Sequence, residues 1–214
     1  MEKIIEPNGK CNKIKIILIG ESGTGKTSLI NAYNGNEFNN NITDYLSSNF
    51  IKKIIKINQI NYTIKIWDTA GQERFRSINK IFIKDSQIVI FVYDITNKQT
   101  FEKLNFWVNY VYQILPKTVI LGLAANKKDL IENNDENYEL NKDKCVIKEE
   151  GEKYADELGA LFCETSAKDD PEGFIDFVRQ LIYKCISERN NIEENWELIV
   201  LNNNLIKKKK KKCC

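Results

Sequence analysis

Histidine is absent from this sequence of 214 residues. Without imidazole there is no Ser-His-Asp triad, no Cys-His protease site and no zinc site with histidine ligands. Any chemistry that the chain performs must therefore use carboxylates, amides, lysine, hydroxyls, thiols, the backbone or a bound ion.

Long apolar runs are also missing. No stretch of about 18 apolar residues, the length that a membrane-spanning helix needs, occurs in the sequence. The first residues lack the apolar core of a signal peptide, and Glu2 stands where N-myristoylation requires glycine. We therefore expect no spanning helix, no signal peptide and no myristoyl anchor.

Cysteine and charge are both distributed unevenly. None of the six cysteines forms a CxxC pair, and the four that lie before the C-terminus predict reduced, buried thiols of a cytosolic protein. The formal net charge is only +2, and the basic excess is concentrated in the lysines at 207–212. Because a nucleic-acid-binding protein spreads basic residues over a face, we expect no nucleic-acid partner.

Short apolar runs alternate with helical patterns along the chain. The alternation predicts an α/β fold with a six-stranded, mostly parallel sheet, helices on both faces and one antiparallel edge strand in a hairpin. The expected strands are 14–19, 50–57, 62–67, 88–93, 119–125 and 161–165, and the expected helices are 26–33, 100–115, 149–158 and 173–186.

The composition changes near both ends. We expect a flexible leader at 1–13, one compact domain at 14–187 and a flexible, polar tail at 188–214. An insertion at 133–144, rich in Asn and Lys, is read as a solvated loop to which the sequence assigns no function.

The segment after the first strand fits the pattern G-x-x-x-x-G-K-[ST] and opens the first helix. Glycines allow a tight turn whose amides point at phosphate oxygens, and the helix N-terminus favours negative charge. Lys26 would contact the β- and γ-phosphates, and Thr27 would offer a hydroxyl to Mg²⁺. The expected phosphate-binding residues are Glu21, Ser22, Gly23, Thr24, Gly25, Lys26, Thr27 and Ser28.

Two tetrapeptides follow the last two predicted strands, and together they predict a guanine site. In the first, 126–129, the Asp129 carboxylate can accept hydrogen bonds from N1 and the amino group of guanine, a pattern that adenine does not offer. The second, 165–168, can close over the same base. The expected base-binding residues are Asn126, Lys127, Asp129, Ser166, Ala167 and Lys168.

The strand that ends at Trp67 leads into Asp-Thr-Ala-Gly-Gln-Glu at 68–73. Asp68 can hold Mg²⁺, and Gly71 can bring its N–H against a γ-phosphate. Gln72 can orient an attacking water and is the expected catalytic residue.

With these motifs, residues 14–187 and the last two residues resemble the Rab family of Ras-like small GTPases. The run WDTAGQERF at 67–75 is typical of that family. The resemblance implies a three-layer P-loop fold, slow GTP hydrolysis and a switch that regulates vesicle traffic. It places Phe38 against the guanine, and it places three aromatic residues where partners read the nucleotide state: Phe50, Trp67 and Phe82.

The resemblance also implies partners and a location. An exchange factor, a GTPase-activating protein, effectors and an escort or GDI-type protein would act on a monomeric chain. Geranylgeranyl groups on Cys213 and Cys214 would anchor the chain, and the neighbouring lysines would add attraction to an anionic leaflet. We expect the cytoplasmic face of an endomembrane, with a cytosolic pool.

One position departs from the family pattern. Tyr45 stands where the family has the threonine of its first switch, whose hydroxyl ligates Mg²⁺ and whose backbone contacts the γ-phosphate. Thr43 or Ser47 could replace the hydroxyl only if the loop shifts its register. In one reading the loop re-forms, with a backbone amide still in contact with phosphate and water in the metal site. In the other reading GTP is bound, but switch ordering and hydrolysis are both weakened. In the second case the chain is a GTP-binding scaffold. A P-loop kinase of a small metabolite is a third possibility, but it would not need the motif at 126–129.

Overall fold

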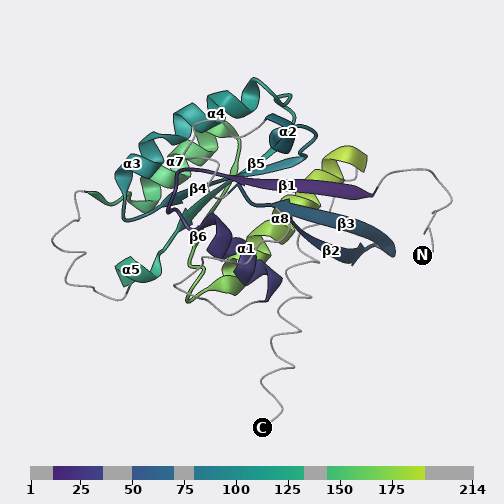
Figure 1. The fold of residues 1–214 in the computed structure, drawn as a ribbon, viewed down its shortest axis with the longest axis horizontal. Helices are drawn as coiled ribbons and strands as arrows, with labels where there is room; N and C mark the ends of the chain where they lie inside the picture. The colour runs from purple at the N-terminus through teal and green to yellow at the C-terminus, as the bar shows by residue number, and fades with distance from the viewer. Residues whose placement is uncertain (1–11, 36–49, 70–79, 133–143, 191–214) are drawn as a thin grey trace, which may run out of the picture.

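The structure, a computed structural model, describes residues 12–35, 50–69, 80–132 and 144–190 (Figure 1). Its centre is one six-stranded sheet in the order β2-β3-β1-β4-β5-β6. Strand β2 pairs antiparallel with β3, and the other pairings are parallel, so the predicted sheet with one antiparallel edge is confirmed. The strands are β1 (Lys13–Ile19), β2 (Phe50–Ile57), β3 (Ile60–Trp67), β4 (Ile88–Asp94), β5 (Ile120–Asn126) and β6 (Leu161–Thr165).

Helices cover both faces of this sheet. Helices α1 and α8 lie on one face, and α3, α4 and α7 lie on the other (Figure 1). The described helices are α1 (Lys26–Asn34), α2 (Lys80–Ile83), α3 (Lys98–Glu102), α4 (Leu104–Tyr112), α5 (Asp129–Glu132), α7 (Lys148–Leu158) and α8 (Pro171–Asn190). None of them is both long enough and apolar enough to span a bilayer.

The two faces bury two separate cores because side chains alternate along each strand. In β1, Ile16 and Leu18 pack with the α1 and α8 side, whereas Ile17 and Ile19 pack with the α4 and α7 side. Strands β4 and β5 are buried at every residue, as expected for parallel strands covered by helices on both faces. The two cores fix the carboxyl ends of β1, β4, β5 and β6 at one edge of the sheet.

Two helical expectations need correction. The single helix expected at 100–115 is two helices, α3 and α4, which meet at Lys103. The backbone tightens there into a 3₁₀-type turn, because the N–H of Phe106 donates to the carbonyl of Lys103, three residues earlier, at 3.1 Å. Helix α8 is longer than expected and continues to Asn190, past the expected start of the tail.

Three of the cysteines lie in the described part of the chain, and none of these three forms a disulfide bond there. Cys145 and Cys185 are buried and Cys163 is half-buried. Burial raises the pKa of each of these thiols above its ordinary value. Cys145 and Cys185 thus fit the predicted buried thiols, and Cys163 is only partly buried. Cys11, Cys213 and Cys214 lie outside the described residues.

Candidate functional site

The loop between β1 and α1 has the shape that the phosphate-binding motif requires. Gly25 has a φ of 91°, in the left-handed region, and a Cβ there would lie 2.3 Å from Nδ2 of Asn126. A Cβ on Gly20 would lie 2.1 Å from the carbonyl oxygen of Val92 in β4. Only glycine fits these positions, because the loop passes directly against the ends of β4 and β5.

Lys26 is 3% exposed, although it carries a charged side chain. Its ammonium donates to the carbonyl oxygens of Gly20 at 3.0 Å and Glu21 at 2.8 Å, so the charge is held within the loop that it follows. Thr24 Oγ1 also donates to the carbonyl of Glu21, at 3.0 Å. A buried ammonium beside the N-terminus of a helix creates a positive field suited to a phosphate chain.

Two side-chain oxygens meet at the start of α1. Thr27 Oγ1 donates to Oδ2 of Asp68 at 2.7 Å, although the two residues come from α1 and the end of β3. In the described ranges, no group of three or more Cys, Asp and Glu residues could hold a metal ion by itself. Hard oxygen donors in this number suit Mg²⁺, which keeps waters and takes further ligands from substrate phosphates.

Asn126 ties three segments together at the end of β5. It is 1% exposed, its Nδ2 donates to the carbonyl of Thr24 at 2.8 Å, and its Oδ1 accepts from the N–H of Ala167 at 3.3 Å. The side chain thus fixes the phosphate loop relative to the loop after β6. It is a structural cross-link within the site.

Asp129 lies in the same place, at the first turn of α5. Its Oδ1 accepts a hydrogen bond of 2.6 Å from Ser166 Oγ, and both residues are buried. Ser166 Oγ in turn accepts from the N–H groups of Lys168 and Asp169, at 3.1 and 2.9 Å. These bonds fix the carboxylate with one oxygen engaged, while Oδ2 has no hydrogen-bond partner in the described part of the chain. A buried, oriented carboxylate of this kind selects ligands that present hydrogen-bond donors.

Lys127 adopts a φ of 71°, and its ammonium pairs with Asp94 Oδ2 at 2.7 Å. Asp94 ends β4, and its other oxygen accepts from the N–H and hydroxyl of Thr96. The ion pair links the ends of β4 and β5 beneath the base-binding motif. Sequence reasoning singled out Lys127 but not Asp94.

A second contact that the sequence analysis missed holds the phosphate loop from α4. Trp107 Nε1 donates to Oε1 of Glu21 at 3.0 Å, and the Lys103 ammonium lies 3.2 Å from Oε2. Trp107 lies within the helix expected at 100–115, but that pattern does not predict its contact with Glu21. Glu21 is more than 80 residues away, and no local signal in the sequence pairs it with α4.

The three aromatic residues expected to face partners form a continuous group. The ring centroids of Phe50 and Trp67 are 4.7 Å apart, and those of Trp67 and Phe82 are 5.6 Å apart. All three side chains are half-buried. The group connects β2, β3 and α2 on the surface.

Several expected residues lie outside the described residues, so their placement stays a prediction. They are Phe38, Tyr45, Gly71, Gln72, Cys213 and Cys214. In the described phosphate loop, Ser22 and Gly23 are exposed, and Ser28 is half-buried in the first turn of α1. Lys168 is exposed and Ala167 is buried.

The fold and the loops at the carboxyl ends of β1, β5 and β6 are those of a P-loop nucleotide-binding protein, in which the loops after β5 and β6 are placed to bind the base. Comparison with protein-family models matches residues 15–186 to the Ras family. The chain is 36% identical to Ras-related protein Rab-21 of Homo sapiens over 177 residues, which cover 81% of this chain and 74% of the relative. The Bos taurus Rab-21 is also 36% identical, over 81% of this chain and 75% of the relative.

A third relative, Ras-related protein Rab-22A of Homo sapiens, is 35% identical over 156 residues, covering 73% of this chain and 75% of the relative. The chain belongs to the Ras family and is a divergent Rab-type small GTPase. It is therefore a guanine-nucleotide-binding switch of membrane trafficking that hydrolyses GTP.

Proposed function

We propose that residues 14–187 form the switch domain and bind GDP and GTP with Mg²⁺ at the edge formed by the loops after β1, β5 and β6. The observation that carries this proposal is the network in which Asn126 joins Thr24 to Ala167 while Ser166 orients Asp129. The network connects a phosphate loop to a base-selecting carboxylate. A P-loop kinase would need the first part but not the second.

In this proposal the amides of residues 21–28 and the Lys26 ammonium bind the phosphates. Asp129 accepts from N1 and the amino group of guanine, and the loop of Ser166, Ala167 and Lys168 covers the base with Phe38 on its other side. Adenine would leave the buried carboxylate unpaired, and this penalty is the source of selectivity.

Thr27 and Asp68 are the residues proposed to hold Mg²⁺, since they already bring two oxygen donors together at 2.7 Å. Bound there, the ion would neutralise charge on the phosphate oxygens. Gly71 N–H would contact the γ-phosphate, and Gln72 would orient the attacking water. Without a partner, such switches hydrolyse GTP at about 10⁻⁴ per second.

Nucleotide state would be read through the aromatic group of Phe50, Trp67 and Phe82. Exchange factors, GTPase-activating proteins and effectors act on Rab-type switches generally, and an escort or GDI-type protein would handle the prenylated form. Cys213 and Cys214 are the proposed prenylation sites, on a tail at 188–214 that would tether a monomeric chain to the cytoplasmic face of an endomembrane. The leader at 1–13 would take no part in nucleotide binding, and a cytosolic pool would accompany the bound form.

Tyr45 leaves a second candidate function, a GTP-binding scaffold with little or no hydrolysis. A tyrosine hydroxyl is too far from its backbone to replace a threonine hydroxyl at the metal without movement of the loop. The scaffold predicts that Tyr45→Thr raises both magnesium-dependent GTP retention and the hydrolysis rate. If the loop instead re-forms around Thr43 or Ser47, Tyr45→Thr changes neither rate.

Single-turnover GTP hydrolysis by the full chain tests both candidates. Measurements on the wild type, Tyr45→Thr, Tyr45→Phe and Gln72→Leu would be made with and without Mg²⁺. Tyr45→Phe is the matched control, because it keeps the ring and offers no ligand. If the wild type hydrolyses GTP and Gln72→Leu hydrolyses it at the same rate, Gln72 is not the catalytic residue.

A further inference from the structure

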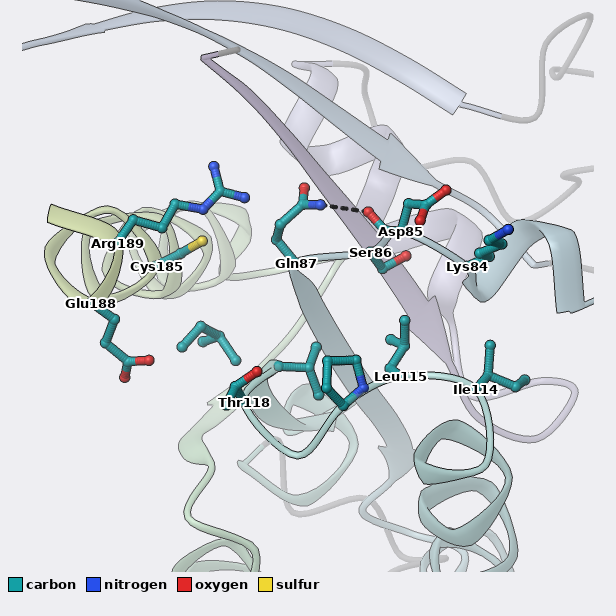
Figure 2. Close-up of a pocket in the computed structure, with 13 residues that line it drawn as sticks. Lys84, Asp85, Ser86, Gln87, Ile114, Leu115, Thr118, Cys185, Glu188 and Arg189 are labelled. Carbon is teal, nitrogen blue, oxygen red and sulfur yellow. Dashed lines mark hydrogen bonds between the residues drawn. The ribbon is translucent and has the colours of Figure 1, made fainter. Parts of the chain in front are cut away.

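A cavity of about 620 Å³ lies at the edge of the sheet opposite the nucleotide site, where β4 and β5 begin (Figure 2). Its size is within the roughly 300–1,000 Å³ of ligand pockets. The C-terminal turn of α8 forms one wall, with Cys185, Glu188 and Arg189, and the loop between α4 and β5 forms another, with Leu115 and Thr118. The nucleotide-binding residues do not line it.

The cavity is apolar at its base and carries one unused polar group. Leu115, Val119, Ile120 and Cys185 are all buried. Ser86 is 7% exposed, and its Oγ has no hydrogen-bond partner in the described part of the chain. That oxygen is shielded from solvent, so the cavity presents mainly apolar surface to an occupant.

The rim is fixed and bears charge of both signs. The Gln87 side chain connects β1 to the turn before β4. Its Oε1 accepts from Lys15 N–H at 2.7 Å, and its Nε2 donates to the Asp85 carbonyl at 2.5 Å (Figure 2). Lys84 and Arg189 are the exposed cations of the rim, and Asp85 and Glu188 are its exposed anions.

The chain itself supplies a segment of matching chemistry directly after the wall of the cavity. Helix α8 ends at Asn190, next to Arg189 on the rim. The sequence then reads Asn-Ile-Glu-Glu-Asn at 191–195 and Trp-Glu-Leu-Ile-Val-Leu at 196–201, which contains the longest apolar run of the tail. Left in water, such a run exposes apolar area that burial would remove.

We propose that residues 196–201, called the apolar tail segment below, fold back and occupy this cavity. Residues 191–195 can span up to about 17 Å, and asparagine is favoured where a chain reverses after a helix. Inside the cavity, the apolar side chains of this segment would cover the buried Leu115, Val119 and Ile120.

Docking would shorten the distance that the domain can reach from the proposed prenyl anchor at Cys213 and Cys214. Residues 191–214 can span up to about 85 Å when extended, whereas residues 202–214 reach only about 45 Å. The docked segment would therefore hold the domain close to the membrane surface and leave the six lysines beside it. This inference concerns a site that the nucleotide does not use, so it stands or fails separately from the proposed function.

Hydrogen exchange of the full chain, loaded with GDP, tests the proposal. We expect backbone amides of residues 114–120 and of the apolar tail segment to exchange at least about tenfold faster in the double variant Trp196→Ser/Leu198→Ser. Leu205→Ser/Ile206→Ser is the matched control, because it removes two apolar side chains farther along the same tail and leaves exchange unchanged. Equal exchange in the wild type and the Trp196 variant would overturn the proposal.

A second variant tests the cavity from the other side. Thr118→Trp places a large side chain at the exposed rim without disturbing a buried residue, and it should release the apolar tail segment to fast exchange. Protection of that segment only when anionic vesicles are added would show a membrane-binding segment instead. Protection that rises with protein concentration would show binding to a second copy, and either result would contradict docking within one chain.

Discussion

The base side and the metal side of the nucleotide site differ in how the protein holds them. On the base side, hydrogen bonds between three loops join Thr24 to Asn126, Asn126 to Ala167 and Ser166 to Asp129. On the proposed metal side, the described residues contribute the pair of Thr27 and Asp68. The base side is thus organised by the protein alone, whereas the proposed metal site would need ligands from the nucleotide and from water.

That difference separates recognition from switching. Preorganised contacts lower the ordering cost of binding, so the guanine base can supply constant affinity in both nucleotide states. The metal side is where GDP and GTP differ, and it is also where Tyr45 departs from the family pattern. Substitutions on the base side should therefore change which nucleotide binds, and substitutions on the metal side should change how it is retained and hydrolysed.

The largest effect is expected from Asp129→Asn. Losing the charge-assisted hydrogen bonds to guanine costs about 3 kcal/mol, or about 100-fold in GDP affinity. The new amide can donate to xanthine, which carries an oxygen in place of the guanine amino group, so affinity for xanthosine diphosphate should rise. Titration calorimetry with GDP and with xanthosine diphosphate measures this change in nucleotide preference.

Asp169→Asn is the control for that substitution, because Asp169 is an exposed aspartate of the adjacent loop. It should leave GDP affinity unchanged. Unaltered GDP affinity in Asp129→Asn itself would mean that the base is not read by this carboxylate.

A smaller effect is expected from Asp68→Asn on the metal side. The substitution removes the carboxylate charge from the Thr27 pair while keeping its shape, so about tenfold more Mg²⁺ should be needed to slow GDP dissociation. Dissociation of a fluorescent GDP analogue over a magnesium titration provides the measurement. Asp85→Asn, at an exposed site far from the nucleotide, should leave the titration unchanged, and an unshifted Asp68→Asn curve would refute the metal assignment.

The smallest effect is expected from Trp107→Phe, which removes the hydrogen bond to Glu21. A net loss of about 0.5–1.5 kcal/mol would speed GDP dissociation roughly twofold to tenfold. Tyr112→Phe is the control, because it changes a half-buried residue at the other end of α4 and leaves the hydrogen bond to Glu21 in place. Equal dissociation rates in Trp107→Phe and the wild type would show that α4 does not support the phosphate loop.

Local patterns in the sequence predicted most of the sheet and the base side of the site. Continuous apolar runs predicted β1, β4 and β5, where burial on both faces leaves few alternatives, whereas β2 and β3 were predicted from runs rich in β-branched residues and are only partly buried. The motifs at 20–27 and 126–129 each follow a strand end. The contacts of Glu21 with Trp107 and of Lys127 with Asp94 were not predictable, because they depend on distances between elements far apart in the sequence. The break at Lys103 was missed since the apolar stripe of residues 101–115 continues across it.

The central claim is that a preorganised carboxylate beside a phosphate loop selects guanine nucleotides. Displacement of a fluorescent GDP analogue from the full chain, in Mg²⁺, by unlabelled GDP or ADP tests it most directly. The account predicts that GDP displaces the analogue at concentrations about 10⁴-fold below those needed for ADP. Equal displacement by the two nucleotides, or failure of the chain to retain the analogue, would contradict it.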